Sequence, residues 1–172
     1  MALQKAMVSS KSNEWATPQD FFDELHREFG FTLDPCSTLE NRKCEKHYTI
    51  RDNGLTKTWA GVVWMNPPYG GHTAHWIKKA YEESKQGCTV VCLITSSTDR
   101  SYWHDYIFPH AAQIRFIRGR LKFNDATYSA PFASAVIIFT EQITYTNRIC
   151  YYTQSISRAK RKGEQQITDW RV

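Results

Sequence analysis

A short apolar run that ends in two consecutive prolines constrains the fold of this chain more than any other feature. Residues 62–65 read Val-Val-Trp-Met, and Asn66-Pro67-Pro68-Tyr69 follows directly. Bulky apolar residues suit a buried strand, whereas proline has no N–H to donate to a neighbouring strand. Each proline also biases the residue before it toward an extended conformation, which leaves backbone carbonyls free. The sequence therefore predicts a strand that stops before Asn66 and a stiff loop that presents hydrogen-bond acceptors.

Hydrophobic periodicity around this loop predicts an α/β domain. Phe21, Phe22 and Leu25 recur on one side of a predicted helix. Thr17 is expected to cap this helix and Gly30 to end it. A strand, a helix and a second strand in succession indicate a parallel, right-handed crossover. In chain order, the predicted elements are a helix over 17–30, strands over 31–35 and 62–65, a helix that Thr73 caps and Gly87 ends, a strand over 89–94, a helix around 101–108, and strands over 114–117 and 134–140. The helix between Thr73 and Gly87 carries Trp76, Ile77, Ala80 and Tyr81 as its apolar residues. The expected fold class is α/β, with a mainly parallel sheet flanked by helices.

The composition is that of a globular protein. The chain has 172 residues, of which 41% are hydrophobic and 14% aromatic, and this is enough for one domain with a hydrophobic core. We expect a flexible N-terminus over residues 1–13, a single domain over 14–152 and a basic, flexible tail over 153–172. No apolar stretch approaches the roughly 20 residues that cross a bilayer, and residues 1–13 lack the apolar core of a secretory signal. The predicted location is the cytoplasm, without membrane contact.

Charge and cysteine content narrow the possible partners. The formal net charge is +5, and cationic residues are dense in the C-terminal tail. A basic tail suits a polyanion such as DNA or RNA, although a tail that only maintains solubility has the same composition. Neither the five cysteines nor the six histidines form pairs with the spacing of metal ligands. We therefore expect reduced thiols and no metal site.

Three of the predicted strands end in polar residues. The strand over 31–35 ends at Asp34 and Pro35, the strand over 62–65 ends at Asn66, and Thr-Ser-Ser at 95–97 follows the strand over 89–94. In open α/β sheets, ligands bind beyond the carboxyl ends of the strands. We therefore expect a site where these three ends meet.

The loop at Asn66 carries groups that can activate a planar amine. The lone pair of the exocyclic amine of adenine or cytosine, or of a glutamine amide, is delocalised, so its nitrogen is a poor nucleophile. Two acceptors, the side-chain oxygen of Asn66 and the backbone carbonyl of Pro67, would stabilise the positive charge that develops as a methyl group arrives. Tyr69 would stack on the substrate, a contact worth on the order of 1–3 kcal/mol for a nucleobase. The competing interpretation is a turn that only ends a strand.

Asn-Pro-Pro-Tyr after an apolar strand resembles the catalytic motif of amino-methyltransferases that use S-adenosylmethionine. A wider run of motifs resembles the phage-type Dam family of DNA adenine methyltransferases. These motifs are WATPQDFFDELHREFG, FTLDPCS, ENRKCEKHYTIRDNGL, VVWMNPPYGGHTAHWIKKAYEE and GRLKFNDATYSAPFASAVIIF, and they cover about residues 14–140. The resemblance implies transfer of a methyl group from S-adenosylmethionine to the N6 amine of adenine in double-stranded DNA.

The resemblance also implies a compact, trimmed Rossmann-like fold and a set of site residues. The catalytic residues would be Asn66, Pro67, Pro68 and Tyr69. The cofactor-binding residues would be Trp15, Thr17 and Pro18 near the methionine end, Asp34 and Pro35 at the start of the cofactor loop, with Asp34 near the ammonium, and Asp52 near the cofactor's adenine. The cofactor loop departs from the usual pattern, because DPCSTLENR contains no glycine. The stretch between Asp34 and Asn66 is also too short for the usual intervening strands and helices.

A base inside a duplex hides its amine, so the enzyme must flip the nucleotide into its pocket. The candidates for contact with DNA are Arg100, Trp103, Arg115, Arg118, Arg120, Lys122 and Phe123. The alternatives are the same chemistry on RNA adenine or on a protein glutamine, or an inactive relative that only binds DNA. Cofactor binding separates the methyltransferases from the inactive relative. The residues do not distinguish a monomer from a homodimer.

Overall fold

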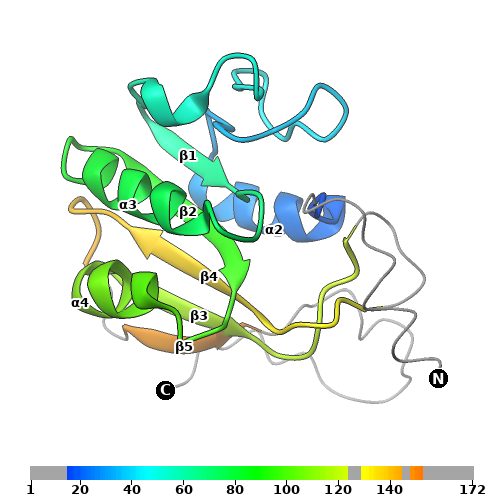
Figure 1. The fold of residues 1–172 in the computed structure, drawn as a ribbon, viewed down its shortest axis with the longest axis vertical. Coiled ribbons are helices and arrows are strands. Elements are labelled where there is room, and N and C mark those ends of the chain that lie inside the picture. Colours follow the sequence, from blue (N-terminus) through cyan, green and yellow to red (C-terminus); the bar gives the residue numbers. More distant parts are fainter. Residues whose placement is uncertain (1–14, 124–128, 145–147, 153–172) are drawn as a thin grey trace.

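A β-sheet lies between helices on both of its faces in the computed structural model of the chain (Figure 1). The structure describes residues 15–123, 129–144 and 148–152, so the predicted terminal segments over 1–13 and 153–172 lie outside it. Within the described residues, the sheet has five strands in the order β1-β2-β4-β3-β5. The strands are β1 (Val62–Met65), β2 (Thr89–Thr95), β3 (Gln113–Ile117), β4 (Ser134–Phe139) and β5 (Ile149–Tyr152).

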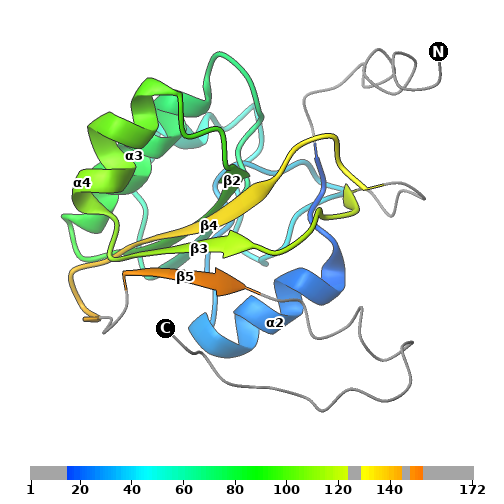
Figure 2. The ribbon, with the colours of Figure 1, turned by 90° about the horizontal axis from the view of Figure 1, so that it is seen from below.

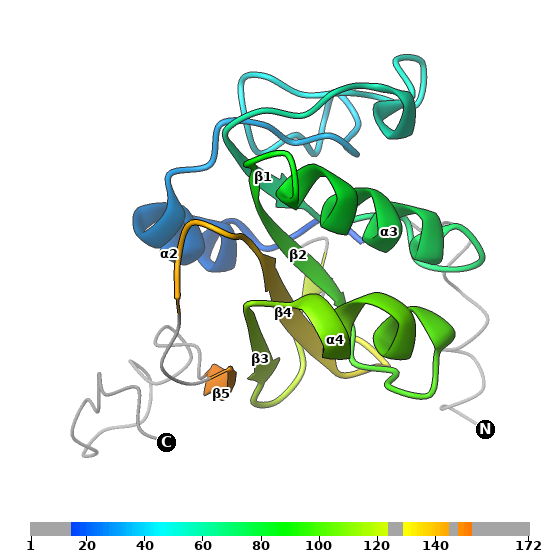
Figure 3. The ribbon, with the colours of Figure 1, turned by 90° about the vertical axis from the view of Figure 1, so that its left-hand side faces the viewer.

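The helices are divided between the two faces of the sheet. The helix α2 (Gln19–Phe29) covers one face, and α3 (Thr73–Ser84) and α4 (Phe108–His110) lie on the other (Figure 2 and Figure 3). A π-helical segment, η2 (Trp103–Ile107), runs directly into α4, and a short 3-10 helix, η1 (Gly54–Thr56), precedes β1. In the parts of the chain that the structure describes, none of the helices is long and apolar enough to cross a membrane.

Alternating side chains of the strands build a hydrophobic core on each face of the sheet. In β2, Val90, Cys92 and Ile94 belong to the cluster that includes residues of α3, whereas Val91 and Leu93 belong to the cluster that includes residues of α2. Successive side chains of a strand point to opposite faces, so a strand that is covered on both faces needs a continuous apolar run. The run TVVCLI provides it, and the predicted α/β architecture is confirmed.

The strands pair in both directions. β1 is parallel to β2, and β3 is parallel to β5, whereas β4 is antiparallel to both β2 and β3. The parallel pairing predicted for the two strands that flank α3 is confirmed. Among the described strands, two pairings are parallel and two are antiparallel. The sheet is therefore mixed, and the predicted parallel arrangement holds for half of its pairings. The described residues between β3 and β4 form no α-helix, and an antiparallel pair needs no crossover helix.

Two helices begin differently from the prediction. Pro18 is the N-cap of α2 and no side chain caps this helix, because the hydroxyl of Thr17 accepts a hydrogen bond from Asn66 instead. Thr73, which was predicted to cap α3, is its first residue. Gly30 ends α2 as predicted, with a φ of 67° that glycine adopts at low cost.

Candidate active site

A cleft of about 560 Å³ opens where β1 ends. Leu33 forms a parallel bridge with Val63 of β1, and this bridge and a second one between Asp34 and His47 replace the predicted strand over 31–35. The segments that follow Leu33 and β1 therefore meet at one edge of the sheet. The cleft is lined by residues 35–41, 47, 49–54 and 66–68, together with Trp15 and Trp76. Residues 95–97, which were predicted to join the site, are not part of this lining.

The side chain of Asn66 lies in the cleft with only one end of its amide paired. Its Nδ2 donates to the backbone carbonyl of Trp15 at 2.6 Å and to the hydroxyl of Thr17 at 3.0 Å. Its Oδ1 is buried and has no hydrogen-bond partner. A buried acceptor without a donor costs roughly 1–3 kcal/mol, so the site favours a ligand that donates to it. A primary amine is such a ligand.

Asp34 lies beside Asn66 at a small polar cavity of about 20 Å³, roughly the space that one water molecule requires. One carboxylate oxygen accepts from the Lys43 N–H at 3.0 Å and the other from the Cys36 N–H at 3.4 Å. Burial raises the pKa of Asp34 to about 6, and these two hydrogen bonds oppose the rise. Burial and the nearby charge of Asp34 also raise the pKa of the Cys36 thiol well above its usual value. Cys36 therefore lines the cleft as a neutral thiol.

Asp52 provides an exposed carboxylate in the lining of the large cleft. Its Oδ2 accepts from both the backbone N–H and the hydroxyl of Thr49, each at 2.8 Å, and these bonds lower its pKa. The group is therefore ionised at neutral pH and can accept a hydrogen bond from a ligand. This position is compatible with the predicted contact to the amino group of an adenine.

The wall that carries Asp52 is packed tightly at Gly54. A Cβ atom on Gly54 would lie 2.0 Å from the carbonyl oxygen of Pro35 and 3.3 Å from Cη2 of Trp76. Two non-bonded atoms cannot approach to 2.0 Å, so one of the two backbone segments would have to move. The absence of a side chain at Gly54 therefore allows the 49–54 segment to lie directly against the segment that begins at Pro35.

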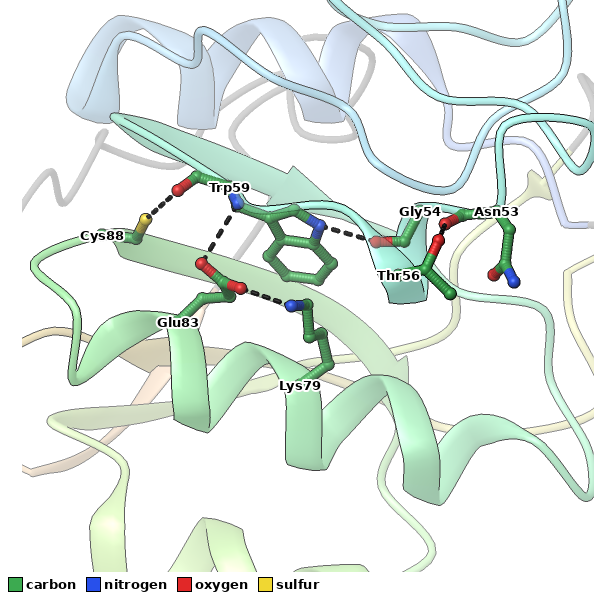
Figure 4. A network of polar contacts seen from close by, with 7 residues as sticks. All are labelled: Asn53, Gly54, Thr56, Trp59, Lys79, Glu83 and Cys88. Atoms are coloured by element: carbon green, nitrogen blue, oxygen red, sulfur yellow. Dashed lines mark hydrogen bonds and ion pairs between the residues drawn. The ribbon is translucent and has the colours of Figure 1, made fainter.

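Trp59 ties this wall to α3 (Figure 4). Its indole Nε1 donates to the carbonyl of Gly54 at 2.9 Å, and its backbone N–H donates to Glu83 at 3.1 Å. Glu83 is also paired with Lys79, and the Cys88 thiol donates to the Trp59 carbonyl at 3.2 Å. The buried network therefore fixes both the backbone and the ring of Trp59, and through the ring it fixes the turn at Gly54.

Trp59→Phe should weaken ligand binding in the cleft. The change keeps an aromatic ring but removes the buried indole donor to the Gly54 carbonyl, which then keeps only its bond from the Lys57 N–H at 3.3 Å, and a lost hydrogen bond costs roughly 0.5–1.5 kcal/mol. We expect a lower melting temperature and a higher dissociation constant for S-adenosylmethionine, measured by calorimetry. Thr56→Val is the matched control, because it removes an exposed bond to Asn53 in the same turn and should change the unfolding free energy by no more than about 0.5 kcal/mol. Equal effects of the two variants would contradict the role of the indole.

Tyr69 does not line the cleft in this structure. Its side chain is 9% exposed, and its ring packs edge-on against Phe132 and Phe123, with centroid distances of 5.4 and 6.3 Å. Its hydroxyl donates to the Leu93 carbonyl at 3.5 Å, and burial raises its pKa. Stacking of Tyr69 on a substrate therefore remains a prediction that requires the surrounding rings to move.

Trp103 and Phe123 are core residues, contrary to the predicted contacts with DNA. Trp103 is 0% exposed and stacks on Phe116, with ring centroids 6.1 Å apart. Phe123 is 1% exposed and packs edge-on against Trp15 at 5.6 Å. Burial of a large aromatic surface stabilises the fold strongly, and neither ring is accessible to a base in this structure.

The predicted cationic residues differ in how freely they can bind DNA. The exposed ones are Arg100, Arg118, Arg120 and Lys122. Arg120 already donates to the Pro131 carbonyl at 2.8 Å, which ties the segment after β3 to the segment before β4. Arg115 is buried and forms a two-bond ion pair with Glu28 at 2.7 and 2.5 Å, so it is not available for a phosphate.

The remaining predicted residues are divided between the two cavities. Trp15, Pro35, Pro67 and Pro68 line the large cleft, and Thr17 lines the small one. Pro18 lines neither, since it caps α2. The sequence did not single out Trp76, which lines the cleft from α3. Its helical spacing with Ile77 and Ala80 indicated a core position, and no local signal marked its exposure to the cleft.

The sequence of this chain matches a family of known proteins. The family model for DNA N-6-adenine-methyltransferases (Dam) matches residues 4–166. A DNA N-6-adenine-methyltransferase of Escherichia phage T1 is 30% identical over 110 residues, which are 62% of this chain and 45% of that protein. The match thus spans less than half the length of the phage relative.

A solved structure from Listeria monocytogenes, assigned to the class I S-adenosylmethionine-dependent methyltransferases, has a similar fold. The TM-score is 0.57 at 12% identity, over 90% of this chain and 70% of that chain. At this identity the similarity shows the fold alone. It confirms the predicted Rossmann-like methyltransferase fold.

Proposed function

This chain belongs to the Dam family of DNA N-6-adenine-methyltransferases, and we propose that it transfers a methyl group from S-adenosylmethionine to the exocyclic N6 amine of adenine in double-stranded DNA. The observation that carries the proposal is the buried, unpartnered Oδ1 of Asn66 at the wall of the cleft. An exocyclic amine supplies the donor that this oxygen lacks. With DNA as its substrate, we expect the protein to act in the cytoplasm, and in that of the host cell if a phage encodes it.

Asn66 and Pro67 would activate the amine by accepting its two hydrogens. S-adenosylmethionine, when bound, supplies the electrophilic methyl group. Hydrogen bonds to Oδ1 of Asn66 and to the carbonyl of Pro67 become stronger as the nitrogen acquires positive charge, so they stabilise the transition state more than the bound substrate. The methylated nitrogen is acidic and releases its extra proton to water, so no strong general base is required.

The groups around the cleft support binding of S-adenosylmethionine. A volume of about 560 Å³ is in the range of pockets for ligands of this size. Trp15, Pro35 and Trp76 supply apolar lining. The ionised carboxylate of Asp52 would accept from the adenine amine, and Asp34, beside Asn66, would bind the ammonium directly or through water.

Asp34 should make cofactor affinity depend on pH. Its pKa of about 6 leaves it mostly protonated at pH 5 and mostly ionised at pH 7, and an ammonium prefers the ionised form. Affinity for S-adenosylmethionine should therefore rise by about tenfold over this interval, and Asp34→Asn should abolish the rise. The raised pKa also means that the contribution of Asp34 to the unfolding free energy is largest below about pH 4 and is lost as pH rises through about 6. Calorimetry at several pH values tests this, and an unchanged slope in Asp34→Asn would assign the ammonium to another group.

Base flipping would bring the adenine to Asn66. Because Tyr69, Phe123 and Phe132 pack against one another, a stacked base requires Tyr69 or Phe132 to move aside. The exposed side chains of Arg100, Arg118 and Lys122 are available for phosphate contacts, which predicts affinity that falls with salt.

A comparison of substrates tests the proposed function. Labelled S-adenosylmethionine would be incubated with the protein and with duplex DNA, single-stranded DNA, structured RNA or a glutamine-containing peptide. We expect transfer to duplex DNA above all others. Transfer mainly to RNA or to the peptide would replace the substrate while leaving the amine chemistry in place. Cofactor binding without transfer to any of them, or no cofactor binding, would contradict the proposal.

A further inference from the structure

We propose that Thr17 and the backbone carbonyl of Trp15 are a positioning device that holds the Asn66 amide in one orientation and makes an amide, rather than a carboxylate, necessary at residue 66. The inference rests on the proposed function, because it concerns the same acceptor oxygen. It assigns to Thr17 a role that acts through Asn66 rather than through the cofactor.

The geometry leaves the amide only one favourable orientation. The Trp15 carbonyl can only accept, and it lies 2.6 Å from Nδ2 of Asn66. Rotation of the amide by half a turn would bring Oδ1 to this position, so that two oxygens without a hydrogen between them would meet. The Thr17 hydroxyl, 3.0 Å from Nδ2, accepts the second amide hydrogen. With both hydrogens used, Oδ1 is left as the free acceptor.

The two acceptors are held by the fold rather than by a loose loop. Thr17 is 5% exposed and directly precedes Pro18, whose carbonyl accepts the first hydrogen bond of α2 from Phe22 at 3.1 Å. The ring of Trp15 packs edge-on against Phe132 and Phe123, at 5.0 and 5.6 Å. The start of α2 therefore determines where Oδ1 of Asn66 points, although the two segments are far apart in the sequence.

This arrangement distinguishes asparagine from aspartate. An aspartate has nearly the same shape and would still offer an oxygen to the substrate. Its second oxygen would replace Nδ2 and would lie close to the Trp15 carbonyl oxygen, where the two would repel each other. Asn66→Asp should therefore lower kcat by roughly 10²-fold or more, as the loss of a properly aimed acceptor does.

Two variants of Thr17 test the positioning role directly. Thr17→Val keeps the shape but removes the acceptor, and Thr17→Ser keeps the acceptor. We expect Thr17→Val to lower kcat for methyl transfer by roughly 3- to 10-fold, with an unchanged dissociation constant for S-adenosylmethionine, and Thr17→Ser to retain wild-type kcat. In the Asn66→Ala background, Thr17→Val should have no further effect, because both changes act on one interaction. Weaker cofactor binding with normal kcat would overturn the inference and make Thr17 a cofactor ligand.

A measurement without catalysis separates this inference from the proposed function. In NMR spectra, the side-chain amide protons of Asn66 are identified as the pair that disappears in Asn66→Ala. These protons should be protected from exchange with water in the wild type and in Thr17→Ser, and one should lose protection in Thr17→Val. Unprotected protons in the wild type would overturn the inference even for an active enzyme. Protected protons in a protein that transfers no methyl group would leave the positioning intact and contradict the function. Thr17→Ala replaces Thr17→Val in both experiments if the valine variant does not fold.

Discussion

Asn66→Ala should lower the kcat of methyl transfer by roughly 10²-fold or more while the protein remains folded. The substitution removes Oδ1, the buried acceptor without a partner, and loss of one aimed hydrogen-bonding group commonly has an effect of this size. It also removes the donor to Trp15 and Thr17, which should lower the unfolding free energy by roughly 0.5–1.5 kcal/mol per hydrogen bond lost. Single-turnover rates with saturating cofactor and DNA measure the effect on chemistry.

Two controls separate catalysis from folding in this experiment. The melting temperature should fall by no more than several degrees, since a change of 1 kcal/mol shifts it by about 2–4 °C in a chain of this size. The dissociation constant for S-adenosylmethionine should remain near the wild-type value. A rate within threefold of wild type would contradict the role of Asn66, and loss of cofactor binding would move that role from the substrate to the cofactor.

Gly54→Ala should distort the cleft strongly, although it adds only one methyl group. The new Cβ would lie 2.0 Å from the Pro35 carbonyl oxygen, so the 49–54 segment must move away from Pro35. Overpacking of this kind costs roughly 1–3 kcal/mol, and it would displace Asp52 from the lining. We expect a melting temperature lower by several degrees and S-adenosylmethionine affinity weaker by roughly tenfold or more.

Gly71→Ala is the matched control for this substitution. A Cβ atom on Gly71 would meet no heavy atom within 4 Å, and its backbone does not have a positive φ. Its melting temperature and cofactor affinity should equal those of the wild type. If both alanine variants bind the cofactor normally, the close approach of Gly54 to Pro35 does not shape the binding site.

Local sequence predicted the strand β1 and its end at Asn66. The apolar run that forms β1 and the two prolines that end it are short-range features, and they place Asn66 at the edge of the sheet without information from elsewhere in the chain. The continuous apolar run over 89–94 likewise predicted the strand β2, and the structure shows that this strand is covered on both faces. These elements depend on residues that are adjacent in the sequence, which is what patterns can report.

The features that the sequence did not predict depend on distant contacts. Threonine is a common N-cap residue, but the Thr17 hydroxyl accepts a hydrogen bond from Asn66 and does not cap its own helix. Trp103 was predicted to contact DNA, yet its indole is buried in the core. β4 is antiparallel to its neighbours because of where the chain returns to the sheet, and its own residues do not encode that direction. In each case the local sequence was compatible with more than one arrangement, and contacts between distant segments determined which one formed.

The role of Asn66 is tested most directly by identifying the atom that receives the methyl group. Duplex DNA would be incubated with labelled S-adenosylmethionine and either the wild-type protein or Asn66→Ala, and the digested nucleosides would be separated and identified by mass. We expect label in N6-methyladenine with the wild type and its near-complete loss with Asn66→Ala. Label in another nucleoside, or equal labelling of adenine by both proteins, would contradict the claim that the free oxygen of Asn66 activates the adenine amine.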